Sequence, residues 1–281
     1  MRTVEEVILQ HGDRGIERVA GCLPPHYCLR AAEALWACPR GCVLLATGFP
    51  VRGTYETDGP IAAVGLYGAL MHLGFEPHFV AAPPIAHVLA ERYRVIEFPI
   101  LSMQESLRPA RDLLADRRPV AMISIERPGH AADGRCYNMA HQDISDHAAK
   151  LGVLFDAAEC LTIGVGDGGN EIGMGNVQDA LAGLEIRPCV VRVTHLIAAT
   201  TSNWGVYGLM ACLSHLSGRP LLDDVDEHAV FDFFLSRHAV DGRTLRREKT
   251  VDGHHLDRTT GILGQLREVI AGWNGRQGPT A

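Results

Sequence analysis

Short runs of apolar residues alternate with amphipathic segments along most of the chain. Such short apolar runs are typical of buried strands, and several of them end at glycine or at a charged residue. Strands are therefore predicted at 43–48, 75–81, 95–98, 120–125, 161–166 and 189–193. Apolar positions three or four residues apart predict helices at 28–37, 59–73, 85–93, 107–114, 143–158, 204–216, 225–238 and 256–272, and two short helical turns around Gly12 in 3–20.

Strands that alternate with helices imply crossover connections between neighbouring parallel strands. The prediction is an α/β fold with a largely parallel or mixed sheet and helices on both faces, in three layers. No low-complexity linker divides the sequence. We therefore expect a single domain over 1–281, with a core at about 40–216, N-terminal helices in 1–38 and C-terminal helices in 225–273 as additions.

Composition and charge exclude several classes of protein. Hydrophobic residues make up 47% of the 281 positions and charged residues 21%, as in soluble globular proteins. A net charge of −7 argues against nucleic acid or an anionic membrane as a partner. The sequence has no apolar run of membrane-spanning length and no signal-peptide pattern at its start, so a cytoplasmic protein is expected. Assembly of this chain into a homo-oligomer is left open by the sequence.

Lysine and cysteine narrow the chemistry further. The two lysines, Lys150 and Lys249, lie outside any Schiff-base or P-loop context. None of the eight cysteines forms a C-x-x-C pair, so reduced and packed thiols are expected. A zinc site is disfavoured by irregular spacing in the one set that could form it, Cys22, Cys28, Cys38 and Cys42.

Glycine and charged residues gather in three loops, each directly after a predicted strand. Glu56 and Asp58 follow the first strand, Glu126 begins the loop after 120–125, and Asp167 and Glu171 follow 161–166. The carboxyl ends of parallel strands meet at one edge of a sheet, where ligands of such folds bind. These loops therefore predict a functional site that is rich in carboxylates.

The third loop also imitates a dinucleotide-binding pattern. Gly164, Gly166 and Gly169 satisfy G-x-G-x-x-G after a strand. The pattern should continue directly into a helix, but Gly173 and Gly175 follow and disfavour one. Carboxylates in the same loop would also repel a pyrophosphate, so dinucleotide binding is not expected.

The three loops resemble the D-glutamate cyclase family. The resemblance rests on Glu56-Thr57-Asp58-Gly59-Pro60, on the Gly166–Asn176 run of glycine, acid and amide residues, and on 126–129, 132–134, 137–139, 143–145 and 202–205, in order over about 45–213. It implies a lyase that closes D-glutamate to 5-oxo-D-proline with loss of water, without a required cofactor. In larger relatives this unit is a C-terminal domain. His130, Arg135 and Cys136 depart from the family's usual residues.

The chemistry that the resemblance implies needs a base, an acid and a clamp for carboxylates. We expect Asp58, Asp167 and Glu171 to transfer protons or hold the substrate ammonium, and Arg127 to bind a substrate carboxylate through its planar fork. The remaining candidates are expected to bind the amino-acid substrate. Gly168 and Gly169 would give backbone donors to the oxyanion, and the others are Glu56, Asn138, Asn170 and Asn203.

Structural roles compete with these assignments. Arg127 could form a surface ion pair with Glu126 or Asp133, and Asp58 could cap the helix that begins near Gly59. Asp143 is expected to cap the helix over 143–158, and Trp204 to pack in the interior.

Metal dependence and function also stay open. Mg²⁺ or Mn²⁺ could be held by oxygen ligands from Glu56, Asp58, Asp167 and Glu171. Two rivals to the cyclase remain. One is a metal-dependent hydrolase or ligase-like enzyme acting on a small amino-acid carboxylate or lactam, and the other is an amino-acid-binding sensor without catalysis.

Overall fold

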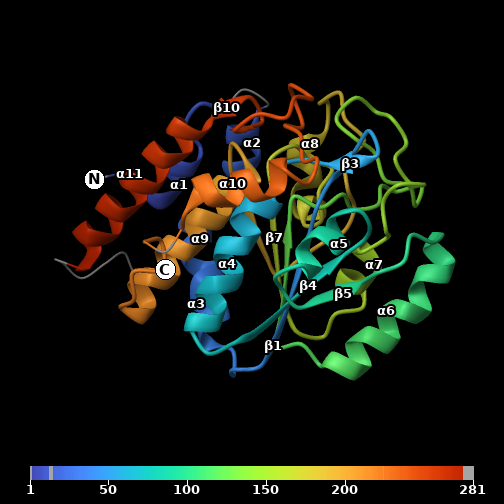
Figure 1. Cartoon of the computed structure of the whole chain (residues 1–281), viewed down its shortest axis with the longest axis horizontal. Helices are drawn as coiled ribbons and strands as arrows, with labels where there is room; N and C mark the ends of the chain where they lie inside the picture. Colours follow the sequence, from blue (N-terminus) through green and yellow to red (C-terminus); the bar gives the residue numbers. More distant parts are fainter. Residues whose placement is uncertain (1, 13–14, 224, 275–281) are drawn as a thin grey trace.

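A parallel sheet forms the centre of the computed structural model, which describes residues 2–12, 15–223 and 225–274 (Figure 1). Within these residues its strand order is β5–β4–β1–β6–β7–β8. The strands are β1 Cys42–Thr47, β4 Glu76–Ala81, β5 Val95–Glu97, β6 Ala121–Ile125, β7 Leu161–Gly166 and β8 His195–Ala198. The chain winds outward from β1 to β5, returns to β6 beside β1, and winds outward in the other direction. The topological switch point therefore lies between β1 and β6, where doubly wound folds bind ligands.

Helices cover both faces of the sheet, which confirms the predicted three-layer α/β fold (Figure 1). One face packs against α1 Val4–Ile8, α3 Tyr27–Ala37, α4 Pro60–His72, α5 Ile85–Ala90, α9 Ser202–Ser217, α10 Glu227–Leu235 and α11 Leu256–Asn274. The other packs against α2 Ile16–Ala20, α6 Met103–Arg117, α7 Gly152–Asp156, α8 Gln178–Leu181 and the 3₁₀ turn Met174–Val177. Two hairpins lie outside the sheet, β2 Pro50–Val51 with β3 Thr54–Tyr55 and β9 Thr250–Val251 with β10 His254–His255.

Both faces of the central strands are buried, which explains why those strands read as continuous apolar runs. In β1, Val43 and Leu45 pack into the core on one side of the sheet, while Leu44 and Ala46 pack on the other. All eight cysteines carry free thiols. Among the described helices, none has both the length and the apolar character needed to cross a bilayer.

Two predicted elements are wrong. The helix expected over 143–158 is present only as Gly152–Asp156. Upstream, Asp143 Oδ1 accepts a hydrogen bond from the backbone N–H of Ser145 at 2.9 Å, a local turn that competes with helix. Asp143 therefore caps no helix. Lys150 Nζ donates to the carbonyls of Ser145 and Ala148, which further fixes this non-helical stretch.

The strand expected over 189–193 lies instead at His195–Ala198. The apolar residues that suggested it are buried, but their backbone bonds go to loops. Cys189 N–H donates to Gly169 O, Val190 N–H donates to His130 O, and Val191 O accepts from Gly173 N–H. The segment thus supports the glycine-rich loop after β7 rather than the sheet.

Candidate active site

A cavity of about 1190 Å³ opens at the carboxyl edge of the sheet, beside the switch point. Residues from all three predicted loops line it, so these loops meet at one edge of the sheet as expected. The predicted candidates in its wall are Glu56, Asn138, Asp167, Asn170 and Glu171. The wall also contains Glu126, which was expected in one of the three acidic loops but was not among the candidate catalytic residues.

Glu126 is held in an unusual position at the end of β6. It is 5% exposed, and its φ of +43° lies in the left-handed region that residues other than glycine rarely adopt. Such conformations cluster at functional sites. Ser202 Oγ donates a hydrogen bond to Glu126 Oε2 at 2.6 Å. Gly59 makes room for this carboxyl group, because a Cβ there would lie 2.7 Å from the Cβ of Glu126.

The electrostatic surroundings of Glu126 favour its protonated form. Burial, followed by the nearby carboxylates of Glu171, Glu56 and Asp58, raises the pKa of Glu126 well above its usual range. The hydrogen bond from Ser202 opposes this only in part. A carboxyl group with a raised pKa keeps its proton to higher pH and can donate that proton to a reacting oxygen.

Glu171 organises the glycine-rich loop. Its two carboxylate oxygens accept hydrogen bonds from the backbone N–H groups of Gly168 and Gly169, each at 2.8 Å. The two donors expected to stabilise a substrate oxyanion are therefore already used within the protein. The prediction for Gly168 and Gly169 is corrected accordingly: these residues position Glu171 and do not line the cavity.

Asp58 and Asn203 lie behind the cavity wall, where each caps the other's helix. Asp58 accepts hydrogen bonds from the N–H groups of Ser202 and Asn203, both at 2.8 Å, at the start of α9. Asn203 Oδ1 accepts from Gly59 at 2.9 Å and Ala62 at 3.1 Å, at the start of α4. Asp58 therefore caps α9 rather than the helix that follows it, and neither residue lines the cavity.

Charge nevertheless connects Asp58 to the site. Burial and the nearby Asp252 raise the pKa of Asp58, while the three backbone N–H groups that it accepts from lower it. Carboxylate oxygens of Asp58, Glu126 and Asp167 lie within 4.8 Å of one another. Asp58 thus acts on its neighbours through charge and position.

Arg127 is buried in the protein interior and does not line the cavity. It is 2% exposed, and its guanidinium donates to the carbonyls of Gly48 at 2.5 Å and Ala149 at 2.8 Å. Burial lowers its pKa to about 10, which leaves it charged at neutral pH. Both the substrate clamp and the surface ion pair expected for Arg127 are therefore corrected: it ties the loop after β1 to the segment before α7.

Three other predicted residues line the cavity from buried or half-buried positions. Asp167 is 3% exposed at the end of β7, and Asn170 Nδ2 donates to the carbonyl of Tyr137 at 2.8 Å. Asn138 bonds within its own loop, through Gln142 and Ala140. Trp204 is fully buried and packs in the core, as expected.

The segment after α10 completes the cavity, which the sequence did not predict. Val240 pairs with the strand end that carries Glu56, through Val240 N–H to Tyr55 O at 3.1 Å and Thr57 N–H to Val240 O at 2.8 Å. Beyond this pairing, Gly242, Arg243, Leu245 and Asp252 line the cavity.

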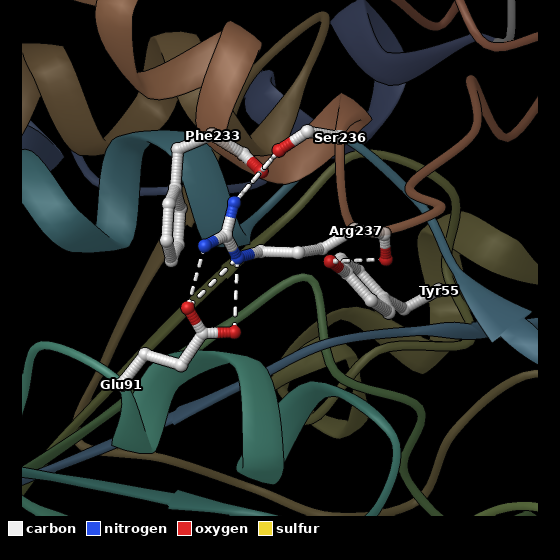
Figure 2. A network of polar contacts seen from close by, with 5 residues as sticks. All are labelled: Tyr55, Glu91, Phe233, Ser236 and Arg237. Carbon is white, nitrogen blue, oxygen red and sulfur yellow. Dashed lines mark hydrogen bonds and ion pairs between the residues drawn. The ribbon is translucent and has the colours of Figure 1, made fainter.

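A polar network fixes that segment to the body of the protein (Figure 2). Arg237 forms a two-pronged ion pair with Glu91, with Nε and Nη2 at 2.9 and 2.6 Å from its two oxygens. The guanidinium of Arg237 lies 4.2 Å from the ring centroid of Phe233. The backbone carbonyl of Arg237 accepts a hydrogen bond from the hydroxyl of Tyr55 at 3.1 Å, which connects the network to the β2–β3 hairpin at the cavity rim.

Among the described residues, two arginines line the cavity. Arg52 is exposed at the turn of the β2–β3 hairpin, and Arg243 is exposed on the opposite C-terminal segment. Arg52 has φ +46° and Gly53 φ +82°, as a two-residue type I′ turn requires. The cavity thus has carboxyl groups at its base and cations at its rim.

The carboxyl groups at the bottom of the cavity could provide hard oxygen ligands for a divalent cation. Asp58, Glu126 and Asp167 offer carboxylate oxygens close enough to share one ion, a donor set that suits Mg²⁺ or Mn²⁺. The set differs from the predicted one. Glu126 enters the set, and the predicted Glu56 and Glu171 are not part of it.

Comparison with known proteins identifies the relatives of this chain. The family model described as "D-glutamate cyclase-like, C-terminal" matches residues 4–267. A human protein named "D-glutamate cyclase, mitochondrial" is 32% identical over 198 residues. That match covers 61% of this chain and 32% of the human protein, so the chain matches about a third of its relative's length.

Proposed function

Because the chain belongs to the D-glutamate cyclase-like, C-terminal family, we propose that it is a lyase that closes D-glutamate to 5-oxo-D-proline with release of water. The human relative is named for that substrate. The match covers only 32% of the human protein, at 32% identity. The reaction is therefore argued below from the residues of this chain.

One observation carries the proposal: three strand ends deliver carboxyl groups to a single cavity beside the switch point. Glu126 and Asp167 directly follow β6 and β7, Glu56 directly follows the β2–β3 hairpin in the loop after β1, and all three are buried in the cavity wall. Cyclisation moves protons between a nitrogen and an oxygen of one small molecule. Neighbouring carboxyl groups in different protonation states suit such a transfer.

The distribution of charge in the cavity suggests how the substrate lies. The ammonium group of the substrate is attracted to the carboxyl groups at the bottom of the cavity. Its α-carboxylate would be repelled from there and attracted to Arg52 and Arg243 at the rim. The γ-carboxyl group then folds back toward the base, next to the amine. This pose brings the nitrogen and the γ-carboxyl carbon to the reacting distance of about 3–3.5 Å.

The proton balance of the reaction matches an acid and a base in the wall. The ammonium nitrogen loses two protons, a C–N bond forms, and the C–O bond to one γ-oxygen breaks. That oxygen leaves with the two protons as water. We assign Glu126, whose raised pKa favours its protonated form, as the donor of the first proton to the leaving oxygen, and Asp167 at the neighbouring strand end as the acceptor of the first proton from nitrogen. The second proton from nitrogen restores Glu126, and Asp167 passes its proton to the leaving oxygen, so that both groups end as they began.

Several other predicted residues act by positioning. Glu171 holds the loop after β7 through Gly168 and Gly169. Asp58 and Asn203 hold the two helix starts that flank Glu126. Glu171, Asp58 and Asn203 can therefore be required for activity without contact with the substrate.

The proposal is tested by incubating the full chain separately with D-glutamate, L-glutamate, D-glutamine and D-aspartate and separating products on a chiral column. It predicts 5-oxo-D-proline from D-glutamate and no lactam from the L-isomer. Saturable binding of D-glutamate without product would instead support the sensor, and the absence of both binding and product would reject the substrate.

A second candidate, a metal-dependent hydrolase of small amino-acid carboxylates or lactams, is favoured by the shared reach of Asp58, Glu126 and Asp167. A cation there would polarise a substrate oxygen. This candidate predicts that chelation abolishes activity, that Mn²⁺ restores it, and that 5-oxo-D-proline or a related amide is opened. A cyclase without a metal keeps its activity after chelation.

A further inference from the structure

Two separate turns of the C-terminal segment contribute to the wall of the active-site cavity. The first turn, at 241–246, carries Arg243 and Leu245, and the second is the tip of the β9–β10 hairpin, which carries Asp252. Leu245 and Asp252 have φ values of +61° and +52°, in the left-handed region that residues other than glycine rarely adopt. Such backbone conformations persist only where the surrounding structure holds them.

One carboxylate, that of Asp241, holds both turns. Its Oδ1 accepts hydrogen bonds from the backbone N–H groups of Arg243 at 2.9 Å and Thr244 at 2.7 Å. Its Oδ2 accepts a hydrogen bond from the N–H of Gly253, at the hairpin tip, at 2.8 Å. The backbone N–H of Asp241 also donates to Arg246 O at 2.8 Å, which closes the first turn. The position of Arg243 therefore depends on this single side chain.

Asp241 lies behind the cavity wall. It is fully buried and does not line the cavity, so a substrate bound there would not contact it. Burying a charge is costly, and the three charge-assisted bonds to backbone N–H groups offset that cost. The preceding residue, Val240, pairs with the strand end that carries Glu56. Asp241 thus connects the two turns to the strand end on the other side of the cavity.

We propose that Asp241 is a positioning residue for substrate binding: its carboxylate holds the turn at 241–246 so that Arg243 can bind the α-carboxylate of D-glutamate. The inference rests on the proposed function, in which Arg243 is one of the two rim cations that attract this group. Glu126 and Asp167, the assigned proton donor and acceptor, lie at strand ends of the central sheet. Loss of Asp241 should therefore weaken substrate binding and leave the chemical step nearly unchanged.

The charge of Asp241 acts on KM in the opposite direction from its position. Removing a carboxylate from the segment that carries Arg243 makes the surroundings less repulsive to an anionic substrate group, which by itself would lower KM. The positioning role predicts that KM rises instead, because the guanidinium is no longer held in place. The direction in which KM changes therefore separates the effect of position from the effect of charge.

The test is steady-state kinetics of the full chain with D-glutamate, together with hydrogen–deuterium exchange of the same variants. Asp241→Ala should raise KM about tenfold or more, while kcat changes less than about twofold. Asp241→Asn keeps one acceptor oxygen, so its KM should lie between those of the wild type and Asp241→Ala. In both variants exchange should become faster in the two turns and stay unchanged in the strands of the central sheet.

Two further variants test whether Asp241 acts through Arg243. In an Arg243→Ala background, Asp241→Ala should raise KM by less than about twofold, because the side chain that it positions is absent. Glu248→Gln is the matched control, since it removes one negative charge from the same segment while its amide oxygen can still accept from Thr244 Oγ1. Its KM, kcat and hydrogen exchange should equal those of the wild type.

An unchanged or lower KM in Asp241→Ala would overturn the inference and leave the cyclase proposal intact. The same holds for an equal rise in KM with and without Arg243. If Asp241→Ala does not fold, Asp241→Asn decides by the same criteria. If the wild type binds D-glutamate without product, the dissociation constant from calorimetry takes the place of KM. A wild type that neither binds nor converts D-glutamate would reject the proposed function, and this inference with it.

Discussion

Asp58 and Asn203 cap each other's helices: the carboxylate of Asp58 binds the first N–H groups of α9, and the amide oxygen of Asn203 binds those of α4. Asn203 Nδ2 also donates to Thr57 O at 3.3 Å. The two helices that flank Glu126 therefore share one buried joint. The position of the proposed acid depends on this joint as much as on β6.

Replacing Asn203 by alanine should destabilise the fold by about 2 kcal/mol, because the buried N–H of Ala62 loses its acceptor and that of Gly59 keeps only Asp58. Urea unfolding measures the loss. Asn138→Ala is the control, since its bonds lie in an exposed loop and should matter much less. An equal loss of unfolding free energy in the two variants would contradict the proposed importance of the Asp58–Asn203 capping.

Glu126→Gln should lower kcat about 100-fold or more if Glu126 gives a proton to the leaving oxygen. KM should change little and the variant should stay folded, because the glutamine oxygen can still accept from Ser202. Asp143→Asn, which removes a charge from a more exposed part of the same cavity wall, should keep most of its activity. A normal kcat for Glu126→Gln would remove Glu126 from the reaction.

Arg127→Ala should act on stability rather than on substrate binding. It removes two charge-assisted bonds to buried carbonyls, a loss of about 3 kcal/mol or more. KM for D-glutamate, measured at a temperature where the variant is folded, should stay close to the wild-type value. A large rise in KM with unchanged stability would return Arg127 to the role of a substrate clamp.

Glu227→Gln should stabilise the protein increasingly as pH rises. The pKa of Glu227 is about 7 when folded, against a reference value of 4.5. Between these values the folded state holds a proton that the unfolded state has lost, so wild-type stability falls as pH rises. The variant loses this dependence.

The difference between wild type and Glu227→Gln should therefore be small near pH 5 and level off above pH 7, at about 3 kcal/mol. Urea unfolding at pH 5, 6, 7 and 8 measures it. A difference that does not vary with pH would mean that Glu227 folds without a raised pKa.

The fold and the convergence of three acidic loops on one cavity could be predicted because both depend on patterns that repeat. Apolar runs ending in glycine and acid marked the ends of β1, β6 and β7, and parallel strands necessarily bring those ends together. The helix over 143–158 failed because a side-chain turn at Asp143 and Ser145 competes locally with helix, which apolar periodicity does not reveal.

The direction of each side chain could not be predicted in the same way. Glu126 and Arg127 are adjacent and equally polar, yet the left-handed φ of Glu126 belongs to a backbone turn that leaves the acid in the cavity wall and the arginine in the interior. Likewise, Asp58 and Asn203 are 145 residues apart in sequence, so their mutual capping is visible only in three dimensions. The contribution of Arg243 and Asp252 to the cavity depends on the pairing of Val240 with the strand end at Glu56.

The most direct measurement is a proton NMR time course of the wild type and of Glu126→Gln with D-glutamate, before and after chelation. The account predicts that the wild type converts D-glutamate to 5-oxoproline, that Glu126→Gln converts it about 100-fold more slowly, and that both remain folded. Unchanged D-glutamate in the presence of folded wild-type protein, with and without added Mn²⁺, would contradict the account.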